Sequence, residues 1–161
     1  MFSFVYQDSE RKYIPVTEGD IRRIEEKFGV IFPEILKYYY IKYNAKYIHT
    51  VYFFVDSDNY EISIDDIIPL LNNIPNYDVE SVKNDEDKYG WVSKSFIPFA
   101  ITEGGDEIYW DSSDGKVYVV FADDGEDENG MLLSRYVCSS IDELFRIMEE
   151  EYIKEVQDQD K

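Results

Sequence analysis

The chain has 161 residues, of which 44% are hydrophobic and 17% aromatic, with a net charge of −19 and a pI near 4.2. This hydrophobic content is far above that of a disordered chain, and the length suits one compact core. The negative charge repels nucleic acid, anionic membranes and free nucleotides at long range. We therefore predict a single domain over residues 1–161, with its core at about 18–152, that binds neither nucleic acid nor membrane.

The sequence gives little support for membrane, disulfide or metal chemistry. No stretch approaches the 18 or so apolar residues of a membrane span, and the first residues lack a secretory signal pattern. Cys138, the single cysteine, cannot form an internal disulfide, and one cysteine with one histidine, His49, excludes zinc and cysteine-protease sites. We expect a cytoplasmic protein that is not an enzyme and holds no metal or cofactor.

The first third of the chain favours helices. Residues 2–6 predict a short strand, and Thr17 suits the N-cap of a helix that Gly29 ends. A proline in the first turn and a broad tyrosine-rich side predict a second helix over 33–44. β-branched and aromatic residues then predict a strand over 49–55.

The rest of the chain predicts mainly strands. A short helix interrupted by a proline is expected over 63–71, followed by a long irregular connection over 72–94. Strands are predicted over 96–100, 107–110, 116–122 and 132–138. Ser140 begins a closing amphipathic helix, and the tail 154–161 is expected to fray. This order predicts an α+β fold, a mostly antiparallel sheet with two N-terminal helices and a closing C-terminal helix packed on it.

Acidic residues are concentrated in one part of the chain. Residues 101–130 contain ten acidic residues and one lysine, a balance of −9, whereas residues 20–46 contain six basic and four acidic residues, a balance of +2. Such an asymmetry indicates an interaction face. The candidate partner-binding residues are Glu103, Asp106, Asp111, Asp123, Asp124, Glu126, Asp127 and Glu128.

Residues 104–107 spell GGDE, which also opens the signature of the diguanylate cyclases. Asp56 and Asp58 precede it as metal-binding carboxylates would, so the pattern suggests a metal-dependent nucleotide enzyme. However, no lysine or arginine lies within residues 59–82 to neutralise a triphosphate, and four matching letters occur often by chance. A turn or bulge formed by the two glycines, with Asp106 as its cap, is the simpler interpretation.

Three separated stretches resemble, in the right order, the SMI1/KNR4 family of the SUKH superfamily. Residues 21–45 look like its opening pair of helices, residues 96–124 are similar to its central strands, and residues 139–152 look like its closing helix. The chain departs from the family pattern at Ala45, where glycine is usual, and at Phe32, where leucine is commoner.

The resemblance implies a mixed α/β binding scaffold without a known catalytic centre, whose partner varies. Many bacterial members are immunity proteins that bind and block a cognate toxin, whereas fungal relatives are regulators linked to cell-wall synthesis. Our hypothesis is a non-enzymatic immunity protein whose acidic residues bind a basic toxin domain. The alternative is a regulatory adaptor that binds an endogenous protein, and the nucleotide enzyme is a remote third. The sequence predicts no oligomeric state.

Overall fold

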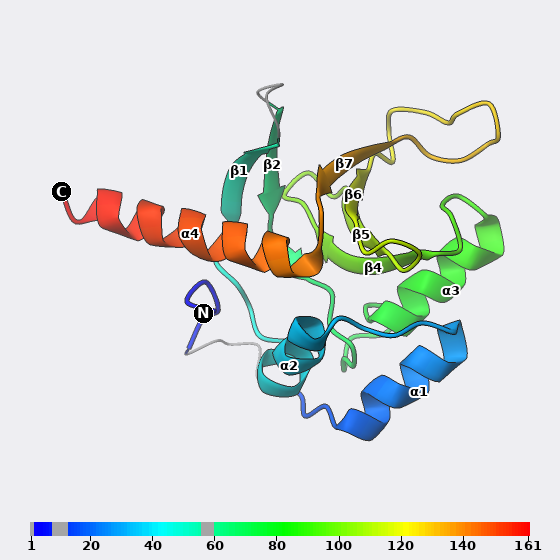
Figure 1. Ribbon diagram of the computed structural model, residues 1–161, viewed down its shortest axis with the longest axis horizontal. Helices are drawn as coiled ribbons and strands as arrows, with labels where there is room; N and C mark the ends of the chain where they lie inside the picture. Colours follow the sequence, from blue (N-terminus) through cyan, green and yellow to red (C-terminus); the bar gives the residue numbers. More distant parts are fainter. Residues whose placement is uncertain (1, 8–12, 56–59) are drawn as a thin grey trace.

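The computed structural model describes residues 2–7, 13–55 and 60–161 of the chain. Two helices come first, then a series of strands interrupted by a third helix, and finally a long closing helix (Figure 1). The elements are α1 (Glu18–Phe28), α2 (Glu34–Tyr43), β1 (Val51–Val55), β2 (Tyr60–Ile64), β3 (Asp66–Ile67), α3 (Val79–Tyr89), β4 (Phe96–Ile101), β5 (Glu107–Asp111), β6 (Val117–Val120), β7 (Ser134–Cys138) and α4 (Ile141–Gln159).

The strands form two antiparallel sheets. β1 and β2 pair as a hairpin, and a larger sheet has the order β3-β4-β5-β6-β7, so its strands are neighbours in the order in which they occur along the chain. The predicted α+β fold, with two N-terminal helices and a closing C-terminal helix, is confirmed. Among the helices that the structure describes, none has the length and apolar character to span a bilayer.

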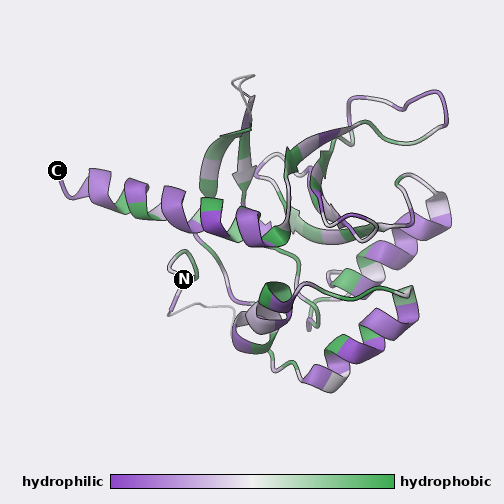
Figure 2. Ribbon diagram, in the orientation of Figure 1, coloured by the Kyte–Doolittle hydropathy of each residue, from purple (hydrophilic) through white to green (hydrophobic). Residues whose placement is uncertain are grey.

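One face of the larger sheet, the inner face, packs against α4 and the start of α2. The ring centroid of Phe145 in α4 lies 5.2 Å from that of Tyr39 and 5.5 Å from that of Phe99. The ring centroids of Phe32 and Trp110 are 5.6 Å apart. Figure 2 shows the green, hydrophobic side of the first turns of α4 next to the sheet. Each such ring contributes about 1.5–3 kcal/mol by burial. The inner-face residues are Ile97, Phe99, Ile108, Trp110, Val117, Val119 and Val137.

The opposite, outer face is only partly covered. Strand alternation and register place on it Phe96, Glu107, Tyr109, Tyr118, Val120 and Tyr136. Val92, just after α3, packs on Tyr109 and Val120. Farther along, Tyr118 is half-buried and Tyr136 is 42% exposed, and their rings meet edge to face at 6.1 Å. This face therefore offers aromatic surface to solvent.

Local capping signals begin and end the helices as expected. Thr17 Oγ1 accepts the backbone N–H of Asp20 at 3.1 Å, and Asp20 Oδ2 accepts that of Thr17 at 2.9 Å, so α1 starts with a full capping box. Gly29 ends α1 with a left-handed φ of 66°. Ser140 caps α4 by accepting the Glu143 N–H at 3.1 Å.

Two predicted elements near the N-terminal side of the sheet are wrong. Residues 2–6 make no strand, and Val5 forms only an isolated bridge with Ile48, because the aromatic side chains of this segment are buried against α2 and α4. Residues 63–71, predicted as a helix, complete β2 and form β3 instead. Pro69 lacks the N–H that a helix needs there, and apolar residues on both sides are buried in the core.

Two predictions underestimated helical structure. The segment 72–94, predicted to be irregular, contains α3, because Asp78 accepts the Ser81 N–H at 2.8 Å and Gly90 ends the helix with a φ of 68°. Residues 154–159, predicted to fray, continue α4, where Lys154 pairs with Glu151 at 2.9 Å. Figure 1 shows this end of α4 extending past the sheet.

Candidate functional site

The structure brings seven of the eight predicted acidic residues to one end of the larger sheet. They lie in the β4–β5 turn and the β6–β7 loop, which touch where Ala122 donates its backbone N–H to Asp106 Oδ1 at 3.4 Å. Figure 2 colours most of the β6–β7 loop as hydrophilic. We call the following set the acidic rim: Glu103, Asp106, Asp123, Asp124, Glu126, Asp127 and Glu128.

Asp111, the eighth predicted residue, lies at the other end of β5 in the β5–β6 hairpin. Its Oδ1 accepts the N–H of Ser113 at 2.9 Å and the hydroxyl of Ser113 at 2.7 Å. Burial raises the pKa of Asp111, but these hydrogen bonds outweigh burial and hold the pKa below its ordinary value. The structure thus gives Asp111 a role in its own hairpin, away from the rim.

The GGDE letters form a turn, as the two glycines predict. Gly105 has a φ of 90° and donates its N–H to the Thr102 carbonyl at 3.0 Å. Thr102 Oγ1 accepts the Asp106 N–H at 3.0 Å. Thr102, and not Asp106 as predicted, therefore caps the turn, which leaves the Asp106 carboxylate directed at the β6–β7 loop.

The two aspartates that the cyclase hypothesis pairs with this turn, Asp56 and Asp58, lie outside the described residues. Among the residues that are described, no three His, Cys, Asp or Glu side chains are grouped so that they could hold a metal ion.

The β6–β7 loop is shaped by one of its own carboxylates. Asp127 Oδ1 accepts the backbone N–H groups of Asn129 and Met131 at 2.8 and 3.1 Å, and the Asp127 N–H donates to the Met131 carbonyl at 2.7 Å. Glu126 and Leu132 form a bridge across the same small hairpin. Asp127 therefore orders the loop, while the neighbouring carboxylates are exposed to solvent.

The charge of the rim affects a neighbouring tyrosine. Tyr60, in β2, packs its ring against the Arg135 guanidinium, which lies 4.4 Å from the ring centroid. Burial raises the pKa of Tyr60, as do the charges of Asp106 and Asp124, whereas Arg135 lowers it. The rim is thus a region of negative potential.

A small cavity of about 130 Å³ adjoins the rim. It is lined by Glu86, Trp91, Val92, Gly105, Glu107, Tyr109, Val120, Ala122 and Leu132. Gly105 and Ala122 belong to the turn and the loop that carry the rim, so the two features share their walls. Most of the lining is apolar, and the polar groups come from α3 and β5.

Glu86 and Glu107 both contact the hydroxyl of Tyr109. A phenol carries one proton and donates to one acceptor, so the second contact requires a proton on a carboxyl group. Burial, together with the hydrogen bond and charge of Glu107, raises the pKa of Glu86 to about 9. The raised pKa favours the protonated form of Glu86 at neutral pH, and the Tyr109 hydroxyl lies between the two carboxyl groups.

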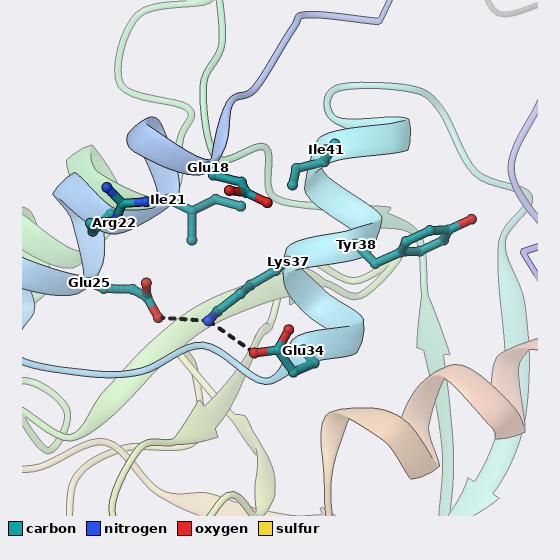
Figure 3. A pocket seen from close by; sticks show the side chains of 8 residues that line it. All are labelled: Glu18, Ile21, Arg22, Glu25, Glu34, Lys37, Tyr38 and Ile41. Carbon is teal, nitrogen blue, oxygen red and sulfur yellow. Dashed lines mark hydrogen bonds and ion pairs between the residues drawn. The ribbon is translucent and has the colours of Figure 1, made fainter.

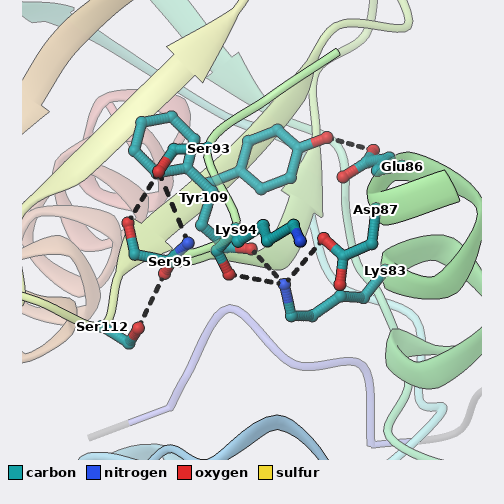
Figure 4. A network of polar contacts seen from close by, with 9 residues as sticks. Lys83, Glu86, Asp87, Ser93, Lys94, Ser95, Tyr109 and Ser112 are labelled. Carbon is teal, nitrogen blue, oxygen red and sulfur yellow. Dashed lines mark hydrogen bonds and ion pairs between the residues drawn. The ribbon is translucent and has the colours of Figure 1, made fainter. Parts of the chain in front are cut away.

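The nearby Lys83 does not neutralise this pair. Its Nζ donates to the carbonyls of Lys94 and Phe96 at 2.8 and 3.3 Å and to Asp87 Oδ1 at 3.2 Å (Figure 4). These three bonds use all the N–H donors of the ammonium group. Lys83 thus joins α3 to β4 and has no donor left for Glu86.

A larger hollow, of about 400 Å³, lies between α1 and α2 (Figure 3). Its lining mixes both signs of charge, because Lys37 Nζ lies 3.2 Å from Glu34 Oε1 and 3.6 Å from Glu25 Oε2, and Glu18 and Arg22 are also present. The rim, by contrast, has one sign of charge. We therefore place the candidate partner-binding site at the rim and its cavity.

A protein-family model matches most of the chain, namely that of the SMI1 / KNR4 family (SUKH-1), over residues 15–147. The chain belongs to the SMI1/KNR4 family. Comparisons with curated proteins and with solved structures gave no match. The matched range includes the whole rim and every residue of the cavity, so both features lie within the SMI1/KNR4 domain.

Sequence reasoning missed the polar groups of the cavity in this SMI1/KNR4 domain. Glu86 falls in the segment that was predicted to be irregular, although Asp78 and Gly90 bracket it as helix caps. Glu107 and Tyr109 alternate with core residues on one strand, which puts both on the outer face. That alternation was the available signal for Glu107, but nothing local places Glu86 beside it.

Proposed function

We propose that this chain is a cytoplasmic, non-enzymatic immunity protein that binds a basic toxin domain through its acidic rim and so neutralises it. The observation that carries the proposal is the gathering of rim carboxylates from two separate loops onto one end of the sheet. Membership of the SMI1/KNR4 family supports a protein-binding scaffold whose partner varies.

The rim suits a basic partner because its charge is not neutralised locally. Within the described part of the chain, none of the rim carboxylates forms an ion pair with a lysine or arginine. Such a surface attracts a basic protein at long range and speeds its association, and salt screens this attraction beyond about 8–10 Å. We expect fast association that slows as the salt concentration rises.

The partner is identified by capture. The tagged full chain is incubated with a lysate of the native organism and washed at low and then high salt, and the bound proteins are identified by mass spectrometry. Recovery of a basic toxin domain that is released by salt fits the proposal. Recovery of a housekeeping protein would favour the adaptor alternative.

The rim is tested by reversing its charge. The variant Asp123→Lys, Asp124→Lys, Glu126→Lys leaves Asp127 to order the loop, and it should lower the association rate constant for the captured toxin at least about tenfold at low salt. The measurement is stopped-flow or surface-binding kinetics at several salt concentrations.

A matched control changes the net charge equally at a distant site. It reverses three exposed carboxylates near the end of α4, namely Glu155, Asp158 and Asp160. The control should bind the toxin nearly as fast as the natural chain. Equal slowing in both variants would mean that only net charge matters, and no slowing in the rim variant would remove the rim from the interface.

A further inference from the structure

Glu86 lines the cavity beside the rim and has a buried carboxyl oxygen without a hydrogen-bond partner among the described residues. Glu86 is 7% exposed, and one carboxyl oxygen, Oε2, is itself buried and receives no hydrogen bond from any residue that the structure describes. Buried polar atoms are nearly always hydrogen-bonded, because leaving one without a partner destabilises the fold. An unsatisfied carboxyl oxygen in a cavity therefore indicates a ligand with a hydrogen-bond donor.

The cavity walls suit a short aliphatic chain. Trp91, Val92, Val120 and Leu132 provide apolar surface around the carboxyl groups. Since a water molecule occupies about 30 Å³ in the liquid, a space of about 130 Å³ holds a group of roughly four or five non-hydrogen atoms. A few methylene groups with a polar head match this size and lining.

The polar groups favour a cation with several donors. The carboxyls of Glu86 and Glu107 meet at the Tyr109 hydroxyl, and an ammonium group offers three N–H donors and no acceptor. Lys83 donates all of its N–H groups elsewhere. At the cavity, Trp91 is 43% exposed and stacks on Tyr89 at 4.7 Å, which provides an aromatic wall of the kind that attracts cations.

We propose that this cavity is a binding pocket for a primary ammonium group on a short alkyl chain, supplied by a lysine side chain of the protein partner. The inference rests on the proposed function, because the rim attracts a basic surface and the pocket then takes one of its lysines. When the ammonium group enters, Glu86 releases its proton to solvent and pairs with the cation. A buried pocket of this kind would supply the central anchor of the interface.

This pairing makes binding depend on pH. The groups that face Glu86 are Glu107 and Tyr109 from β5 and Lys83 from its own helix. Burial and Glu107 raise the pKa of Glu86 to about 9 in the free protein, and binding requires that this proton leave. The affinity for an alkylammonium ion should therefore increase as the pH is raised towards 9, by up to about tenfold per pH unit. An alkylammonium ion keeps its charge over this range, because its pKa is near that of lysine.

The direct test titrates the ¹⁵N-labelled full chain with n-butylammonium at pH 8. The chain has two tryptophans, so its NMR spectrum has two indole N–H signals. The Trp91 signal should shift saturably, with a Kd on the order of 10 mM for so small a probe. Trp110 lies on the inner face and serves as the internal reference. n-Butanol, which has the same chain without the charge, should bind at least about tenfold more weakly.

Two variants test the assignment in different ways. Glu86→Gln keeps a donor for Tyr109 but removes the acid, and it should weaken butylammonium binding at least about tenfold and abolish its pH dependence. Ala122→Leu narrows the cavity without touching the carboxyls and should also weaken binding. The control for both is Glu155→Gln on α4, outside the cavity, which should leave butylammonium binding unchanged. An unshifted Trp91 signal, equal binding of butanol, or full affinity in Glu86→Gln would overturn the pocket.

The outcome for the pocket is separable from the outcome for the rim. The butylammonium titration needs no partner, so its failure leaves the rim and its charge-reversal test unaffected. With the captured partner, Glu86→Gln should raise the dissociation rate at least about tenfold, whereas rim reversal should mainly slow association. A partner that dissociates equally slowly from both proteins would overturn the lysine assignment even if butylammonium binds.

Discussion

The two faces of the larger sheet are built on the same strands but serve different ends. On the inner face, apolar side chains pack under α4 and are almost fully buried. On the outer face, the Tyr109 hydroxyl bonds to the carboxyl groups of Glu86 and Glu107, and Tyr136 is exposed. The inner face contributes stability through burial. The outer face keeps carboxyl groups that burial disfavours, which is expected of a surface retained for binding.

The largest effect should come from the inner face. Phe145→Ala removes a ring that contacts Phe4, Tyr39 and Phe99, and it should lower the free energy of unfolding by about 3–5 kcal/mol. Chemical denaturation followed by circular dichroism measures the loss. Butylammonium should still shift Trp91 under conditions where the variant is folded. A loss below about 1 kcal/mol would mean that α4 is not an essential cover.

At the outer face, by contrast, a substitution should increase the stability of the fold. In the unfolded chain Glu86 loses its proton near pH 4.5, whereas the folded chain keeps it to about pH 9. Over this window the folded state binds more protons, so its stability falls as pH rises, by up to about 1.4 kcal/mol per pH unit. Glu86→Gln removes this dependence. The variant should therefore gain stability over the natural chain between pH 5 and pH 8.

Denaturation curves at several pH values measure this difference. Glu26→Gln, the same substitution on an exposed part of α1, should leave the pH dependence of the natural chain unchanged. If Glu86→Gln and the natural chain lost stability in parallel as the pH rose, Glu86 would not be the buried acid that this comparison requires.

The adjacent strands β6 and β7 give a matched test of the two faces. Val119 is 1% exposed on the inner face, and Val119→Ala should cost about 2 kcal/mol of stability. Tyr136, opposite Tyr118 on the outer face, should cost less than about 1 kcal/mol when replaced by alanine. Thermal unfolding of both variants measures the two losses of stability. Equal losses would mean that the outer face is also a stabilising core.

How far the sequence predicts this fold depends on whether the signals are local. The capping box at Thr17, the two N-terminal helices and the strands over 96–138 follow from caps and periodicity within a few residues. The end of β2 and the strand β3 were missed because short apolar runs fit a helix or a strand equally well until their partners are known. The helix α3 was missed because its segment contains Asn and Asp residues, which favour turns and caps over helix interiors and make the segment resemble a loop.

The candidate site divides in the same way. The rim could be predicted because its residues are close together in the sequence, and charge is a property of composition. Asp111 was grouped with them by sequence distance alone, although the strand carries it to the other end of the sheet. The cavity could not be predicted, since Glu86 and Tyr109 are 23 residues apart and meet only through the packing of α3.

One backbone position just after α2 also departs from the simple comparison, because strain is present there without any binding role. Ala45 follows Asn44, whose side chain bonds to the backbones of Ile14, Leu70 and Leu71, and this anchor holds Ala45 at a φ of 67°. A left-handed conformation costs a non-glycine residue about 1–2 kcal/mol, and a glycine would remove this cost. The substitution would also lose the buried methyl group and give the unfolded chain greater freedom, and these two effects offset most of the gain. Ala45→Gly, which restores the residue usual in the family, should therefore stabilise by about 0.5 kcal/mol, and Ala45→Val should destabilise by at least about 1 kcal/mol. If thermal unfolding showed Ala45→Val to be more stable than Ala45→Gly, filling the buried space would outweigh the backbone strain.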